Sequence, residues 1–288
     1  MKKIFLIFSL LITALAVAPV ALAQKKLTVE KPDLEHIRRA TLDPASKFYY
    51  PRLQALYDAN DTTMTPEQYR YYYFGTMYQE DYNPYRKSDY TDRTDSLLSL
   101  NQVSRLRRDS TIAADKAKKV GQFELTRRYQ EAKTRNLREQ KEIVKIAEKA
   151  LADNPFDLQS MYMLSRLLKD MGKNMSARIW DYRLENILGA IVSSGTGKDE
   201  QNAFFVISPD HEYFLLEVLG YDVDDYEYRE PGFDYLKVTP SDPARANRSK
   251  TPPAFFFDVR PLIQQYNIKY PENSAESSAA GEEINLEN

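Results

Sequence analysis

Aromatic side chains occupy almost every face of one short predicted helix, and this restricts the fold more than any other feature. Thr65-Pro66-Glu67-Gln68 is a strong helix start, with a capping hydroxyl, a proline at the first helical position and a glutamine placed to bond back to the cap. The predicted helix covers 66–78 and carries Tyr69, Tyr71, Tyr72, Tyr73, Phe74, Met77 and Tyr78. Because successive side chains are turned by about 100° around the axis, this helix must be buried or covered by a partner.

Helical signals continue through the N-terminal two thirds of the chain. Pro51 stands where a first helical position is expected, with Leu53 on the apolar face that follows. Residues 92–153 read as charged helical sequence, and a narrow apolar stripe recurs at the helical period over 143–151. Residues 24–43 are polar and unpatterned, and we interpret them as a lead-in to the domain.

After Gly195 the pattern changes from helical to mixed. Aromatic and β-branched runs predict strands over 203–207, 233–238 and 254–259, and a helix over 208–220. The sequence therefore predicts an α+β, mainly α fold in a single domain, 44–270. Its helical part covers 44–193, and a small C-terminal mixed α/β sheet element lies within 199–268. The acidic tail, 271–288, has the composition of disordered sequence.

Residues 148–182 resemble one tetratricopeptide-like helical hairpin. The matching positions are Ala150-Leu151, Asn154-Pro155 at the turn, Leu164 on the first helix, Gly172 at the bend and Ala177 at the helix crossing. The sequence departs from the pattern at Ser165, Leu168 and Asp181. A single copy does not predict a peptide-binding superhelix, which needs about three repeats.

The first 23 residues predict export. Lys2 and Lys3 precede an apolar stretch over 4–20, and Ala21-Leu22-Ala23 is a small-x-small cleavage site, so 1–23 reads as a bacterial signal peptide. We expect a periplasmic or secreted protein with no integral membrane span after cleavage. The chain has no cysteine, which excludes disulfides, thiolate sites and the lipid anchor of an exported lipoprotein.

Charge is balanced overall but segregated along the chain. The net charge of −2 at pH 7 argues against a nucleic-acid partner. Residues 103–150 hold 14 lysines and arginines against 7 acids, and residues 199–236 hold 11 acids against one arginine. The two segments are either solvated surfaces of opposite charge, or one of them is a binding site for a partner.

Several motifs of known chemistry are incomplete. Gly195-Thr196-Gly197-Lys198 lacks the first glycine and the hydroxyl of a phosphate-binding loop, so a surface loop is the better interpretation. His211-Glu212 lacks the second histidine of a zinc protease helix, and the acids at 222–225 lack the ligand spacing of a calcium loop. We therefore expect no cofactor, no metal site and no identifiable catalytic residue.

The chain as a whole resembles a family of exported bacterial proteins, the domain of unknown function 4919. The resemblance rests on five segments: Phe48-Tyr49-Tyr50-Pro51, 60–63, 69–75, 79–85 and 213–220. It covers most of residues 40–265 and implies a coherent exported domain. It implies no activity and no catalytic residues.

We expect a non-catalytic protein-interaction or structural module, because the sequence shows no recognisable catalytic constellation. The candidate partner contacts are tyrosines and arginines: Tyr69, Tyr72, Tyr73, Tyr82, Tyr85, Arg127, Arg128 and Arg135. The alternative is a carbohydrate-active hydrolase or glycan-binding protein that uses paired carboxylates, such as Glu80 and Asp81, beside exposed tyrosines. Burial of the tyrosines in 69–85 would argue against the glycan, and a cleft lined by them would favour it.

Overall fold

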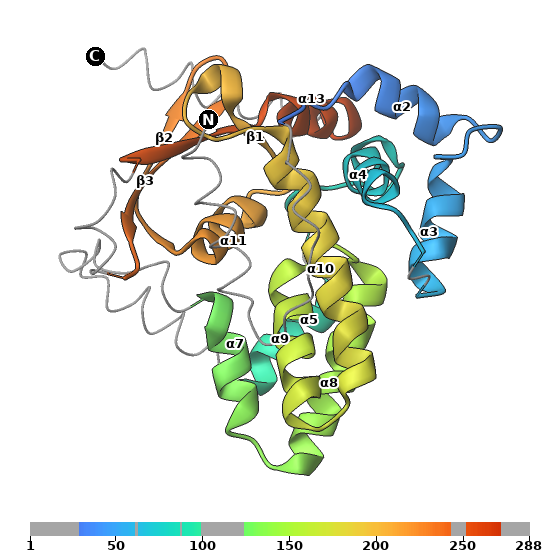
Figure 1. Ribbon diagram of the computed structural model, residues 1–288, viewed down its shortest axis with the longest axis vertical. Coiled ribbons are helices and arrows are strands. Elements are labelled where there is room, and N and C mark those ends of the chain that lie inside the picture. Colours follow the sequence, from blue (N-terminus) through green and yellow to red (C-terminus); the bar gives the residue numbers. More distant parts are fainter. Residues whose placement is uncertain (1–28, 61–62, 87, 99–123, 243–251, 272–288) are drawn as a thin grey trace.

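A computed structural model describes residues 29–60, 63–86, 88–98, 124–242 and 252–271. Within these ranges the chain is mainly helical and carries a small four-stranded mixed sheet toward its C-terminus (Figure 1), which confirms the predicted α+β, mainly α fold. The predicted signal peptide and nearly all of the predicted acidic tail lie outside the described residues. None of the described helices is both long enough and apolar enough to cross a bilayer.

The first helices pack around the aromatic helix. They are α2 (Leu34–Leu42), α3 (Tyr50–Asp58) and α4 (Pro66–Gly75), which continues as the 3-10 turn η1 (Thr76–Tyr78). The predicted start of α4 is confirmed, because the Thr65 hydroxyl accepts from the Gln68 amide at 3.2 Å and the Gln68 side chain accepts from the Thr65 amide at 2.8 Å. The structure also places α2 inside the predicted lead-in, where Asp33 caps it and Ile37 is buried.

The aromatic side chains of α4 form the centre of the core. Tyr72, Tyr73 and Phe74 are each at most 1% exposed, and α4 packs against α2, α3 and the long helix α10 (Asn174–Ser194). The sequence predicted that this helix is either buried or covered by a partner. For these three residues, burial within the chain is confirmed. Figure 1 shows α4 end-on between α3 and α10.

A bundle of antiparallel helices fills the end of the molecule away from the sheet. Its members are α5 (Asp89–Leu97), α7 (Glu124–Lys133), α8 (Leu137–Asp153), α9 (Leu158–Asp170) and α10. The predicted apolar stripe of α8 is buried against this bundle, from Ile143 to Leu151. Between α9 and α10, Gly172 has φ +73°, a conformation that favours glycine.

The described residues of the C-terminal part form a small sheet and two α-helices. Its elements are η2 (Glu200–Asn202), β1 (Phe204–Phe205), α11 (Asp210–Leu219), β2 (Tyr221–Arg229), β3 (Phe233–Pro240), β4 (Ala254–Asp258) and α13 (Arg260–Lys269). The strand order is β1-β4-β3-β2, in which β1 and β4 are parallel and the other two pairs antiparallel. Three of these strands match predicted runs; β2, an edge strand, was not predicted.

Candidate functional site

A polar groove of about 1000 Å³ lies where the helical part meets α11. Its walls come from α3, the segment between η1 and α5, the first half of α7, the turn between α8 and α9, and the start of α11. Most of the side chains that line it are polar or charged, including Gln54, Glu80, Asp81, Arg127 and Asp210. We call this cavity the polar groove.

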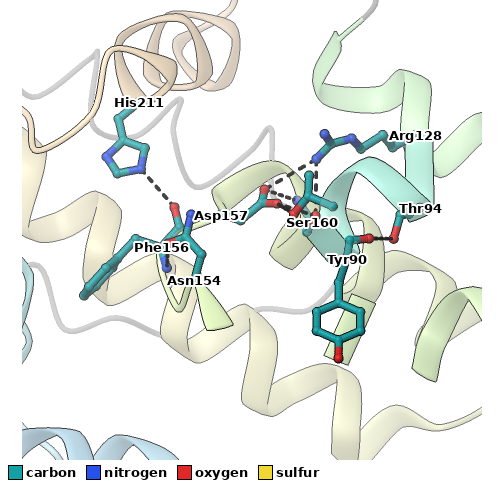
Figure 2. Close-up of polar contacts among 9 residues, drawn as sticks. Tyr90, Thr94, Arg128, Asn154, Phe156, Asp157, Ser160 and His211 are labelled. Atoms are coloured by element: carbon teal, nitrogen blue, oxygen red, sulfur yellow. Dashed lines mark hydrogen bonds and ion pairs between the residues drawn. The ribbon is translucent and has the colours of Figure 1, made fainter. Parts of the chain in front are cut away.

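One wall of the polar groove is built around Asp157, which caps the N-terminus of α9. Its carboxylate accepts the Ser160 amide at 2.9 Å, the Ser160 hydroxyl at 2.7 Å and the Thr91 hydroxyl at 2.9 Å. Arg128 of α7 lies 3.4 Å from the same carboxylate and donates to the Ser160 hydroxyl oxygen at 3.2 Å. Figure 2 shows Arg128, Asp157 and Ser160 pointing toward one another. Three elements are thereby joined through one carboxylate.

The Asp157 carboxylate stays ionised in this setting. Burial by itself raises its pKa, but the charge of Arg128 and the hydrogen bonds of Ser160 and Thr91 outweigh that effect, so the pKa is lowered. Because Arg128 is 9% exposed, its guanidinium belongs to the wall of the groove rather than to a free surface. The pair is a structural cross-link between α7 and α9.

The imidazole of His211, on the first turn of α11, is fixed from both sides. Nε2 lies 2.9 Å from the Phe156 carbonyl oxygen, as Figure 2 shows, and Nδ1 lies 2.7 Å from the Tyr73 hydroxyl. Since a carbonyl can only accept, Nε2 carries the proton and Nδ1 accepts from Tyr73. Burial lowers the His211 pKa, so the ring is neutral. As placed, it holds α11 to α4 and to the α8–α9 turn.

We predict that His211→Gln makes the free energy of unfolding less dependent on pH between 7.5 and 5. The His211 pKa is lowered from its ordinary 6.5, so as the pH falls below that value the unfolded chain takes up the proton first. Stability is therefore present above pH 6.5 and lost below it, by at most about 1.4 kcal/mol per pH unit. Urea unfolding of both proteins across this range measures the difference.

His36→Gln is the matched control, because His36 is the only other histidine and is exposed. This variant removes an exposed imidazole in place of the buried one and so controls for the loss of a histidine as such. The pKa of Glu212 is raised, so Glu212 makes the protein less stable as the pH rises, opposite to the effect of His211. The contribution of His211 is therefore taken as the difference in pH dependence between each variant and the parent protein. Equal pH slopes in His211→Gln and the parent protein would contradict this account.

The predicted tyrosine contacts are mostly in the core. Tyr69, Tyr72, Tyr73 and Tyr82 are between 0% and 5% exposed, whereas Tyr85 is 54% exposed. Tyr82 lines the polar groove, yet its hydroxyl donates to the Ile207 carbonyl at 2.8 Å. Packing against neighbouring aromatic rings, rather than recognition, accounts for the burial of these side chains.

The three predicted arginine contacts do not form one stripe. Arg127 and Arg128 both line the polar groove, with Arg128 turned inward to Asp157. Arg135 is half-buried in the turn after α7 and lines no part of the groove. Arg127 and Arg128 lie on α7, whereas Arg135 follows the end of that helix, so the groove brings together only the first two.

The remaining motifs have structural roles. Gly195–Gly197 packs against the sheet, because the amides of Thr196 and Gly197 donate to the Asn202 carbonyl and the Phe256 amide donates to the Gly197 carbonyl. The acids at 222–225 lie on β2 and bond to Ser241, Thr239 and Lys237. Within the described residues, no group of three or more histidines and acids is placed to hold a metal ion.

Comparison with known proteins identifies the family of the chain, but no individual protein that matches it. The family model described as a domain of unknown function (DUF4919) matches residues 35–126 and 113–267. No curated protein and no solved structure matches the chain. The two matched segments overlap and together cover most of the sequence, as the resemblance predicted. The chain therefore belongs to the DUF4919 family.

Proposed function

We propose that this chain is an exported, non-catalytic interaction module whose protein partner inserts a polar segment into the polar groove. The observation that carries the proposal is the groove itself, whose volume of about 1000 Å³ is at the upper end of the range for ligand pockets. The Arg128–Asp157 pair ties α7 to α9 in one wall of the groove without any partner. Its rim carries exposed polar side chains, including Gln54, Glu80 and Asp81.

The groups in the groove wall that most resemble catalytic residues are engaged by the chain itself. Both ring nitrogens of His211 are hydrogen-bonded, and Asp157 accepts three hydrogen bonds and faces Arg128. A general base must reach the proton that it removes from a substrate. Neither side chain has a free site for that proton in this arrangement, which supports binding rather than proton transfer.

Two further parts of the proposal rest on sequence. Export follows from the signal-like residues 1–23, which lie outside the described residues. The α9–α10 pair has a tight bend at Gly172 and a fully buried Ala177 at the crossing, which supports the tetratricopeptide-like interpretation of the hairpin. Interaction through helical surfaces is the use that this interpretation suggests.

The glycan alternative has less support at this groove. It needs tyrosine rings with open faces, and four of the five predicted tyrosines are buried. Glu80 and Asp81 do line the groove, but Tyr82 presents little ring surface beside them, being 5% exposed. The groove therefore offers a sugar carboxylates but no exposed aromatic ring on which to stack.

Site-directed photocrosslinking tests the groove as the partner site. We predict that a photoreactive benzoylphenylalanine at Gln54 or Asp81 gives one shared adduct when the full chain is expressed in its native host. The same residue at Met175, which is 74% exposed and does not line the groove, is the matched control and should give no such adduct. Mass spectrometry of the adducts identifies the partner. Equal crosslinking from all three positions would contradict a groove-specific partner.

A further inference from the structure

A second, smaller cavity of about 270 Å³ lies beside α11, β2, β3 and α13. It is separate from the polar groove, although α11 contributes to both, with Asp210 and His211 on the groove and Glu212 and Tyr213 on the smaller cavity. Four tyrosines and two acids line it: Tyr85, Tyr213, Tyr226, Tyr228, Glu212 and Asp234. The side chains contributed by α13 are apolar.

The two acids are buried and lie close together. Glu212 is 1% exposed and Asp234 is 7% exposed, and both line the same cavity, close enough for the charge of Asp234 to raise the pKa of Glu212. The Tyr226 hydroxyl donates to Asp234 Oδ1 at 3.0 Å, a hydrogen bond that favours the ionised form of Asp234 against the burial that raises its pKa. Burial, followed by the mutual repulsion of the two groups, raises the pKa of Glu212 well above its ordinary value.

Glu212 Oε1 is fully buried and receives no hydrogen bond from the described residues. Two other buried acids have a cation beside them: Asp157 faces Arg128, and Asp258 accepts from Arg260 at 2.9 Å. Buried Asp222 instead accepts from the Ser241 hydroxyl at 2.7 Å. No described lysine or arginine forms an ion pair with Glu212 or Asp234. An uncompensated buried carboxyl group is costly, so the pair is a position where a positive charge would be stabilised.

The surroundings of the pair are aromatic and acidic. The titratable groups that face it from the packed elements are Asp210 and Tyr213 of α11, Tyr226 and Tyr228 of β2, and Tyr85 of the segment before α5. Tyr85, Tyr226 and Tyr228 are each more than 40% exposed, so their rings form the mouth of the cavity. Tyrosine faces attract cations, and combined with an acid they form the type of cage that binds ammonium groups.

We propose that this cavity binds an organic cation, an ammonium or guanidinium group that lies against Glu212 and Asp234 with its carbon atoms between the tyrosine rings. The cavity offers two carboxyl groups and otherwise rings and apolar side chains, which is too few oxygen ligands for a calcium or magnesium ion. A neutral sugar would leave the buried acid pair without a counter-charge. The cation is either a free amine or the side chain of a lysine or arginine in a partner protein.

Binding of the cation displaces the proton that the acid pair holds. Affinity should therefore rise with pH, by up to about tenfold per pH unit while one proton is released for each cation bound. A neutral ligand would show no such dependence. This release of a proton on binding distinguishes a cation held by the acid pair from one adsorbed on the acidic surface of β2.

Isothermal titration of the full chain tests the proposal with butylammonium, butylguanidinium, tetramethylammonium, glucose and calcium chloride as separate ligands. We expect at least one organic cation to bind, with proton release that shows as a heat proportional to the ionisation enthalpy of the buffer, and neither glucose nor calcium to bind here. Glu212→Gln should lower the affinity at least tenfold, and Tyr228→Ala, an exposed position, should weaken it without affecting folding. Asp224→Asn, which changes an exposed acid of β2, is the control and should change nothing.

A short capped peptide with a central lysine separates the two sources of the cation. Tighter binding of this peptide than of butylammonium indicates a side chain of a partner, and binding of butylammonium alone indicates a free amine. Unchanged affinity in both Glu212→Gln and Tyr228→Ala would overturn the proposal, as would binding of glucose or calcium in place of the organic cations, or no binding of any probe. None of these results depends on a partner in the polar groove, so the two proposals fail separately.

Discussion

Asp157→Ala is expected to lower the free energy of unfolding by about 3–5 kcal/mol, the range for removing one partner of a buried ion pair. The substitution removes the buried carboxylate that faces the Arg128 guanidinium, whose side chain is 11% exposed. It also removes the cap of α9 and the acceptor of the Ser160 and Thr91 hydroxyls. Urea unfolding at pH 7, followed by circular dichroism, measures the loss.

Asp153→Ala is the matched control for this prediction. Asp153 is the last residue of α8 and pairs with Arg86 at 2.7 Å, but the two side chains are 33% and 47% exposed. Solvent screens such a pair, so the expected loss is at most about 1 kcal/mol. If the two variants lose equal stability, the burial of the Arg128–Asp157 pair has no energetic consequence and this account of the groove wall is wrong.

Acid should weaken the same cross-link. The Asp157 pKa is lowered from its ordinary 3.8, so its contribution is complete above that value and is lost as the pH falls through the lower, folded-state pKa. Asp157→Ala removes this part of the acid sensitivity. Parent and variant should therefore differ most near neutral pH and converge in strong acid.

The helices were predictable where a local signal fixes both an end and a buried face. Thr65 and Gln68 define the start of α4 through neighbouring atoms, and the aromatic residues that follow leave no face for solvent. For α8 only the apolar stripe was predicted, because the helical stretch over 92–153 was not divided and its cap, Asn136, was not singled out. Such patterns need no knowledge of the rest of the chain.

Strand β2 was missed because its acids suggested an ion-binding loop. Tyr221–Arg229 is an edge strand, and most of its side chains from Asp224 onward are exposed. Because these side chains face solvent, they are mostly polar and lack the apolar pattern of a buried strand. Charged residues on an edge also oppose pairing with another chain. Its pairing with β3, in a hairpin joined by residues 230–232, shows that this segment is a strand.

The candidate site could be predicted only in part. Arg127 and Arg128 were singled out by charge, and both do line the polar groove. Thr91, Asp157 and Ser160 were missed as a group, since Thr91 comes from α5 and the other two from the start of α9. The Asp157-x-x-Ser160 spacing signals a helix cap, but nothing in it indicates that Arg128 lies opposite. Local sequence patterns do not show which distant segments come into contact, so they could not predict this group of residues.

Gly195→Ala is expected to destabilise the protein by about 3 kcal/mol, at the upper end of the range for overpacking. An alanine Cβ at this position would lie 2.2 Å from the Ala203 carbonyl oxygen and 2.6 Å from that of Asn202. The Gly195 backbone is extended, with φ −167°, so the effect comes from this clash and not from backbone strain. Both obstacles are main-chain atoms that lead into β1, which cannot move aside as a flexible side chain would. Thermal or urea unfolding measures the loss.

Gly189→Ala is the matched control and should have the opposite sign. Gly189 lies within α10, and a Cβ there would meet no atom within 4 Å. Alanine stabilises the interior of a helix relative to glycine by about 0.5–1 kcal/mol, so this variant should unfold later than the parent protein. The two substitutions are chemically identical and differ only in what surrounds the new methyl group. If both variants behave alike, Gly195 does not lie against the chain at Asn202 and Ala203, and the segment joining α10 to the sheet is an open loop, as the sequence predicted.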